Sequence, residues 1–168
     1  MTLSPQTREE AVRQALTLLL QRVGDESFDV CPIFYSDAPF VQIPRTTWYE
    51  LRDRGWVNPL RKTPHLGCTL SGSGWIQALE VTGRIDAHDF LDRLKRLTST
   101  LKNVVKGRNA DEYVKTRGVA SAIGTSPQFV FNVIESRLID HHFRIYGAEW
   151  SDRPHVIRVP LNFGMHPL

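Results

Sequence analysis

The sequence predicts a mainly α-helical protein with small β-hairpins, organised as two consecutive units at residues 1–84 and 85–168. Three observations support this prediction. Apolar residues recur every three or four positions in two long segments, which is the spacing of a buried helix face. A glycine at position 124, followed closely by a serine–proline pair, indicates a tight turn between two shorter helices. Two pairs of short apolar runs, each separated by a polar turn with proline, indicate hairpins.

The composition is that of an ordinary globular protein and argues against several other classes. Of the 168 residues, 41% are hydrophobic and 23% are charged, so the chain has enough apolar material for a core. The longest apolar run, at residues 16–20 and broken by Thr17, is far shorter than the roughly 20 residues that cross a bilayer. The N-terminus also lacks a basic segment followed by an apolar one. We therefore expect a cytoplasmic protein that makes no contact with a membrane.

The charge is mildly basic and unevenly distributed. The formal net charge is +3 and the pI is about 9.1. Residues 1–84 carry nine Lys and Arg against nine Asp and Glu, whereas residues 85–168 carry twelve against nine. A basic excess permits nucleic-acid binding without requiring it. Its position predicts that an anion binds to the second half.

The first predicted helix covers residues 5–23. Ser4 before Pro5 is a typical N-cap and first helical position, and Gly24 is a typical stop. Residues 28–35 then have the composition of a strand, before prolines interrupt any long element. The inward face of the helix, at spacings of four, three and four, is predicted to contain Val12, Leu16, Leu19 and Val23.

A second helix is predicted over residues 45–54, with Trp48 and Leu51 facing inward and Gly55 at its end. A short apolar pair, a basic turn with prolines and the strand-like residues 66–70 follow it. This order is expected of a recognition helix that runs into a two-stranded wing.

The wing strand continues into the letters LSGSG and then a further helix that ends near Gly83. In this respect residues 45–83 resemble winged-helix transcriptional regulators, of the broad type that includes the MarR and PadR groups. In those proteins a wing strand commonly runs into a leucine, a Thr or Ser, and a glycine before the next helix. The resemblance implies a wing that carries Arg61 and Lys62 at its tip.

A long helix is predicted over residues 86–108, where it would join the two units. Away from its apolar face, Lys95, Lys102 and Lys106 fall at spacings of seven and four and form a lysine stripe. Such a stripe is either a phosphate-binding surface or an ordinary solvated helix face. The inward residues are predicted to be Leu91, Leu94, Leu97, Leu101, Val104 and Val105.

The segment GVASAIGTSPQFVFNVIES, residues 118–136, resembles the helix-turn-helix pattern when Gly124 lies at the turn. Ala120 supplies the small residue needed where two helices cross closely, and Ser126 before Pro127 is an N-cap signal for the second helix. The alternative interpretation is an ordinary helical hairpin within a core. The inward positions are predicted to be Val119, Ile123, Val130 and Val133.

A second wing is predicted from the apolar runs at residues 143–146 and 156–159. The predicted fold class is therefore mainly α with small β-wings, in tandem winged-helix units, and the resemblance implies a transcriptional regulator that binds double-stranded DNA sequence-specifically. The side chains expected at base edges are Ser126, Gln128, Phe131 and Asn132. Those expected at phosphates are Arg61, Lys62, Lys95, Lys102, Lys106, Lys115, Arg117, Arg137 and Arg153.

Other functions stay open. Phe129 and Phe131 make the helix at residues 126–138 unusually aromatic, so its outward face suits a protein partner as well as a DNA groove. The main alternative is a winged-helix interaction adaptor that binds no DNA. A weaker alternative is a small catalytic or ligand-sensing domain. A homodimer is compatible with the DNA-binding function and with the adaptor function. Cys31 and Cys68 have no metal-site spacing, and no nucleophile–base set or phosphate loop stands out. We therefore predict no catalytic residues, no metal and no cofactor.

Overall fold

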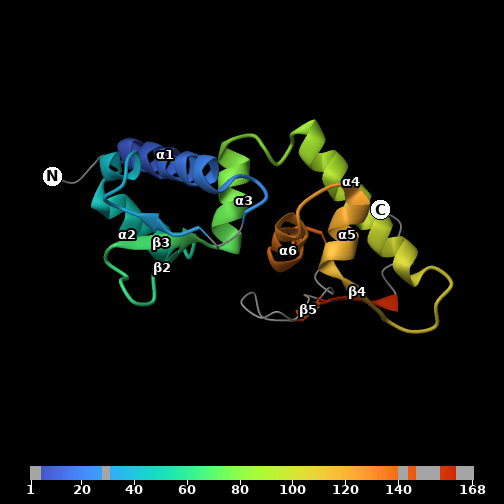
Figure 1. The fold of residues 1–168 in the computed structure, drawn as a ribbon. Coiled ribbons are helices and arrows are strands. Elements are labelled where there is room, and N and C mark those ends of the chain that lie inside the picture. Colours follow the sequence, from blue (N-terminus) through green and yellow to red (C-terminus); the bar gives the residue numbers. More distant parts are fainter. Residues whose placement is uncertain (1–4, 28–30, 140–143, 147–155, 162–168) are drawn as a thin grey trace. The chain divides into compact units, whose positions relative to one another are not determined.

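The computed structural model describes residues 5–27, 31–139, 144–146 and 156–161. Within these residues the protein is mainly helical and contains two small antiparallel sheets. The chain divides into two compact units, Met1–Asp86 and Ala87–Leu168 (Figure 1). We call them unit 1 and unit 2 and describe each by itself.

Unit 1 opens with its longest helix, and a short 3₁₀ helix precedes its second α-helix. The helices predicted over residues 5–23 and 45–54 are confirmed, and the stop of the first one is Gly24, whose φ is +74°. The elements in chain order are α1 (Pro5–Val23), β1 (Ile33–Phe34), η1 (Phe40–Gln42), α2 (Arg45–Asp53), β2 (Val57–Pro59), β3 (Gly67–Leu70) and α3 (Gly72–Val81).

The sheet of unit 1 has three antiparallel strands in the order β1-β3-β2, so the last strand in the chain is the central one. Ile33 of β1 pairs with Cys68, and Val57 of β2 pairs with Leu70. The sequence predicted only the two strands of the wing as a pair, and β1 is the third. Within the predicted strand at 28–35, residues 28–30 lie outside the described residues.

The core of unit 1 lies between its helices and the inner face of its sheet. A Cβ atom on Gly74 would overlap the backbone carbonyl oxygen of Trp56, so only glycine lets α3 approach this closely. The hydroxyl of Ser71 accepts a hydrogen bond from the Gly74 N–H at 3.1 Å and caps α3. In Figure 1, α1 lies above the sheet with α3 beside it. The fully buried side chains include Leu16, Leu19, Leu51, Leu70, Trp75 and Leu79.

Unit 2 repeats the order of the first six elements of unit 1, with an α-helix where unit 1 has its 3₁₀ helix; within the described residues it has no counterpart of α3. Its sheet has the order β4-β6-β5, so the last strand is again the central one. The sequence predicted both wing strands but not β4. The elements are α4 (His88–Val105), β4 (Glu112–Lys115), α5 (Thr116–Ile123), α6 (Pro127–Glu135), β5 (Arg144–Tyr146) and β6 (Val156–Val159).

The turn between α5 and α6 has the geometry predicted from the sequence. Gly124 ends α5 in the left-handed conformation, with φ of 69° and ψ of 41°, which glycine adopts without a Cβ penalty. The hydroxyl of Ser126 accepts a hydrogen bond from the Phe129 N–H at 3.1 Å and caps α6. Val119, Ile123, Val130 and Val133 are all buried, as predicted.

The inward face of α4 differs in part from the prediction. Phe90 is fully buried, whereas Leu91 is 38% exposed, so the helix begins its apolar face one residue earlier than predicted. The reason is an aromatic contact with α6: the rings of Phe90 and Phe129 meet edge to face, with centroids 5.7 Å apart. The helix also ends at Val105, so Lys106 follows it and is not part of a helical stripe.

Candidate nucleic-acid interface

Three long side chains share one side of α2. Arg45, Tyr49 and Arg52 are spaced by four and three residues, which places them on one face of a helix. Trp48 and Leu51 point inward and anchor α2 to the core of unit 1. Tyr49 is 51% exposed although it is a large aromatic residue. The helix therefore presents two guanidinium groups and a phenol ring together.

A groove with a volume of about 230 Å³ lies beside this face of α2. Its basic lining consists of Arg45 and Arg52 from the helix and His65 from the β2–β3 loop. Its remaining lining consists of aromatic and proline rings, namely Tyr35, Trp48, Tyr49, Pro59 and Pro64. No acidic residue lines it. We call it the α2 groove.

The inner wall of the α2 groove is a packed aromatic cluster. The rings of Tyr35 and Trp48 have centroids 4.8 Å apart and are tilted by 31°, and Phe40 meets Trp48 at its edge with centroids 6.1 Å apart. Burial and the neighbouring Cys68 thiol raise the pKa of Tyr35, so its phenol keeps its proton at neutral pH. The wall is therefore uncharged and carries a hydroxyl.

The basic side chains of the groove differ in whether an acidic residue pairs with them. Arg52 forms an ion pair with Asp53 at 3.0 Å and places its guanidinium carbon 5.1 Å from the centroid of the Tyr49 ring. Arg45 and His65 have no ion-pair partner among the described residues. The nearby carboxylate of Glu50 is engaged elsewhere, by Arg8 at 2.9 Å and by Arg54. The groove is thus left with uncompensated positive charge.

The basic residues of unit 1 are concentrated in the stretch of sequence that supplies most of this groove. Residues 45–65 contain five Lys and Arg against two Asp and Glu, whereas the rest of residues 1–86 contains four against eight. Arg61 and Lys62, predicted as phosphate contacts, are exposed on the β2–β3 loop beside it. Unit 1 has no net basic charge, yet it has one basic region. The prediction that an anion would bind to the second half rested on charge totals, which hid this local excess.

The predicted base-edge residues of unit 2 are not arranged as a reading surface. Asn132 was predicted to face outward but is fully buried, and its side-chain oxygen accepts a hydrogen bond from the Gln128 amide at 3.1 Å. Gln128 and Phe131 are partly buried, and the hydroxyl of Ser126 is used as a helix cap. The reason is that α6 packs against both α5 and β5, so more than one of its faces is covered.

The aromatic face predicted for a protein partner is also largely internal. Phe129 is fully buried, and the guanidinium carbon of Arg93 lies 4.5 Å from the centroid of its ring. Only Phe131 of the two aromatic residues retains partial exposure. The sequence could not reveal this, because the ring packs against a helix about 40 residues earlier in the chain.

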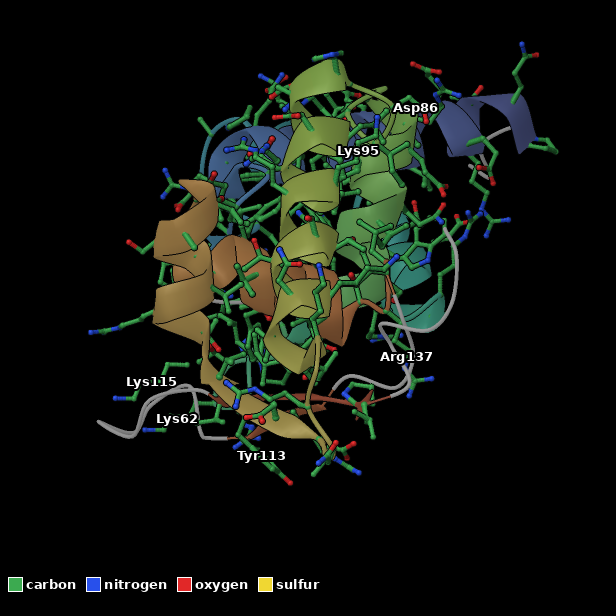
Figure 2. The ribbon with its side chains drawn as sticks, turned by 90° about the vertical axis from the view of Figure 1, so that its right-hand side faces the viewer. Lys62, Asp86, Lys95, Tyr113, Lys115 and Arg137 are labelled. Atoms are coloured by element: carbon green, nitrogen blue, oxygen red, sulfur yellow. The ribbon has the colours of Figure 1, made fainter. Side chains whose placement is uncertain are left out.

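The predicted phosphate contacts of unit 2 do not gather into one patch. Figure 2 shows Lys95 on the upper part of α4, whereas Lys115 and Tyr113 of β4 lie at the lower end of the unit. Arg137 lies on the opposite side of the unit from Lys115. Lys102 is partly buried, whereas Lys106 and Arg117 are exposed. Arg153 lies outside the described residues. The lysine stripe is therefore reduced to Lys95 and Lys102.

Sequence reasoning missed four residues of the α2 groove, namely Arg45, Tyr49, Arg52 and His65. The first three could have been found from their helical spacing within the predicted helix at 45–54. His65 could not, because its place depends on how the β2–β3 loop folds back toward α2.

No group of three or more His, Cys, Asp or Glu side chains in the described part of the chain could hold a metal ion. Of the helices whose residues are described, none has the length and apolar character needed to cross a membrane. No protein-family model, curated protein or solved structure matches the chain.

Proposed function

We propose that this protein binds double-stranded DNA and that unit 1 makes the principal contact. The observation that carries the proposal is the joint placement of Arg45, Tyr49 and Arg52 on one side of α2, next to a basic loop. A helix fits the major groove of B-form DNA, and arginine is the side chain that most often reads guanine there. Lysine and arginine on an adjoining loop suit the phosphate backbone.

The element order supports a winged-helix interpretation of both units. Each unit has a helix, a strand, two helical segments and two further strands, with the last strand central in its sheet. In this interpretation α2 is the recognition helix of unit 1 and the β2–β3 loop is its wing. A sequence-specific transcriptional regulator is the role that the winged-helix resemblance implies. We assign no base-reading role to α6, because Asn132 is buried.

The proposal is tested with a duplex whose two ends are closed by hairpin loops, so that it offers no free ends. Fluorescence anisotropy at about 50 mM salt is expected to show binding that weakens steeply as salt rises, because phosphate contacts release counterions. Arg45→Ala and Lys62→Ala are each expected to weaken binding about 5- to 10-fold. Lys62→Ala is also expected to reduce the salt slope by about one.

A matched control is available on α1. Arg13 is exposed and has no ion-pair partner among the described residues, and it does not line the α2 groove. Arg13→Ala removes the same charge from the same unit and is expected to leave the affinity nearly unchanged. Equal losses from all three variants would show that net charge alone drives binding. Absence of binding by the unaltered protein at about 50 mM salt would contradict the proposal.

A second candidate function is an interaction adaptor that binds another protein. Its support is Tyr113 on the edge strand β4, which is 61% exposed. Exposed aromatic residues are enriched at protein interfaces. Native mass spectrometry of the purified protein, combined with the DNA-binding measurement, separates the two functions. An oligomer or a retained protein partner, together with no DNA binding, would favour the adaptor.

A further inference from the structure

The lining of the α2 groove is more aromatic than a phosphate site requires. A phosphate is bound by cations and backbone N–H groups, whereas five of the eight lining residues are aromatic rings or prolines. Flat apolar surfaces of this kind bind other planar rings by stacking. The chemistry of the groove therefore indicates a ligand that combines a planar ring with negative charge.

The size of the groove limits this ligand to a single ring system. Its volume of about 230 Å³ is below the ~300–1,000 Å³ of pockets that enclose drug-sized molecules. Pro59 and Pro64 line it from the side of β2 and the β2–β3 loop, and Tyr49 lines it from α2. A nucleobase is a planar ring of suitable size, and it carries its charge on the adjoining phosphates.

We propose that the α2 groove holds one unpaired base, so that the preferred substrate is DNA in which a duplex carries an unpaired nucleotide. This inference rests on the proposed function, since it concerns the same face of unit 1. Tyr49 and the Arg52 guanidinium that lies over its ring supply the stacking surface, because bases stack on both aromatic and guanidinium planes. At such a position Arg45 and His65 bind the phosphates on either side of the unpaired base, in place of the base-edge contact that an arginine of α2 makes in a paired duplex.

The base in a fully paired duplex cannot enter the groove without first leaving its stack, which costs a few kcal/mol. An unpaired nucleotide avoids most of this cost. The groove therefore discriminates between paired and unpaired positions without reading the identity of the base, because every base has a stacking face.

The experiment compares two DNA molecules that differ by one nucleotide. One is a duplex closed at both ends by hairpin loops, and the other is the same duplex with a single unpaired adenine in its middle. Anisotropy at equal salt is expected to show about 10-fold tighter binding of the second molecule. With 2-aminopurine as the unpaired base, its fluorescence is expected to be quenched on binding, because the base becomes stacked.

Two exposed tyrosines provide the variant and its control. Tyr49→Ala is expected to remove the preference for the unpaired nucleotide, while Tyr49→Phe keeps it because the ring remains. Tyr113→Ala removes a tyrosine of unit 2 that is at least as exposed as Tyr49, and it is expected to keep the full preference. Far-UV circular dichroism of each variant checks that the protein is folded, and the 2-aminopurine signal of the unaltered protein does not depend on any variant.

The outcomes separate the inference from the proposed function. Equal affinity for both DNA molecules, with no change in 2-aminopurine fluorescence, would overturn the inference and leave duplex binding intact. Failure to bind either molecule would instead overturn the proposed function. A preference that persists in Tyr49→Ala or disappears in Tyr113→Ala would overturn the assignment of the groove.

Discussion

Gly118 and Gly74 both lie in helices, yet a methyl group is expected to have opposite effects at the two positions. A Cβ atom on Gly118 in α5 would have no atom within 4 Å beyond its neighbours, so alanine fits without a clash. Alanine also restricts the unfolded chain and favours the helix. We expect Gly118→Ala to stabilise unit 2 by about 0.5–1 kcal/mol. Urea unfolding followed by far-UV circular dichroism measures this, and an unchanged or lower midpoint would contradict it.

Gly74→Ala is the opposite case. The added Cβ atom would overlap the backbone carbonyl oxygen of Trp56, which directly precedes β2 and cannot rotate away. We expect a loss of about 1–3 kcal/mol in the free energy of unfolding of unit 1. Tryptophan fluorescence reports mainly this transition, because three of the four tryptophans, Trp48, Trp56 and Trp75, belong to unit 1. A variant with unaltered stability would mean that α3 does not approach the Trp56 backbone this closely.

At the scale of elements, one carboxylate ties the start of β4 to the end of β6. Asp111 accepts hydrogen bonds from the Leu161 N–H at 2.9 Å and from the Arg158 guanidinium, with Nε at 2.8 Å. The Leu161 hydrogen bond, and then Arg158, lower the pKa of Asp111. The two strands pair over Glu112–Lys115 and Val156–Val159, directly beside these contacts.

The lowered pKa predicts an acid dependence for this strand pair. An aspartate whose pKa is lower in the folded state than in the unfolded state stabilises the folded state. This contribution is complete at pH values above the unfolded pKa of about 4, and it is lost as the pH falls through the folded pKa. We therefore expect unit 2 to lose stability below about pH 4. Asp111→Asn should be less stable near neutral pH and should show a smaller loss on acidification. Thermal unfolding measured across this range checks both, and parallel pH profiles for the two proteins would exclude the role.

The elements that the sequence predicted correctly are those with local signals. The turn between α5 and α6 has a left-handed glycine and a serine cap, both readable from residue type. β4 was missed because its four residues run into α5 with no turn residue between them. Asn132 was predicted to face outward because the helical spacing of apolar residues indicates a single buried face. It is buried because α6 packs against both α5 and β5.

The candidate site was only partly predictable for a related reason. Arg61 and Lys62 follow from a basic turn between two strands, and helical spacing gives the face of Arg45 and Tyr49. The α2 groove itself depends on the packing of Tyr35 against Trp48 and on the course of the β2–β3 loop. These contacts join positions more than ten residues apart, which sequence periodicity does not describe.

For the whole molecule, the two units are expected to be separable. The core of unit 1 is formed by its own helices and sheet, and Arg84 pairs with Asp25 at 2.6 Å within the same unit. We expect residues 1–86 expressed alone to fold and to keep most of the DNA affinity of the full chain. Circular dichroism and anisotropy on the fragment measure these two properties. An unfolded fragment would show that unit 1 requires unit 2, and a folded fragment without affinity would move the DNA contact to unit 2.

The central place of the last strand in each sheet also affects the order in which the protein is completed on the ribosome. Unit 1 has all its strands once Leu70 has been made, whereas unit 2 lacks its central strand until Val156–Val159 has been made. Domains generally fold as units in the order in which they are made. A stop codon before Val156 would therefore remove the partner of both β4 and β5 and leave unit 2 incomplete, while the nascent unit 1 would already be folded.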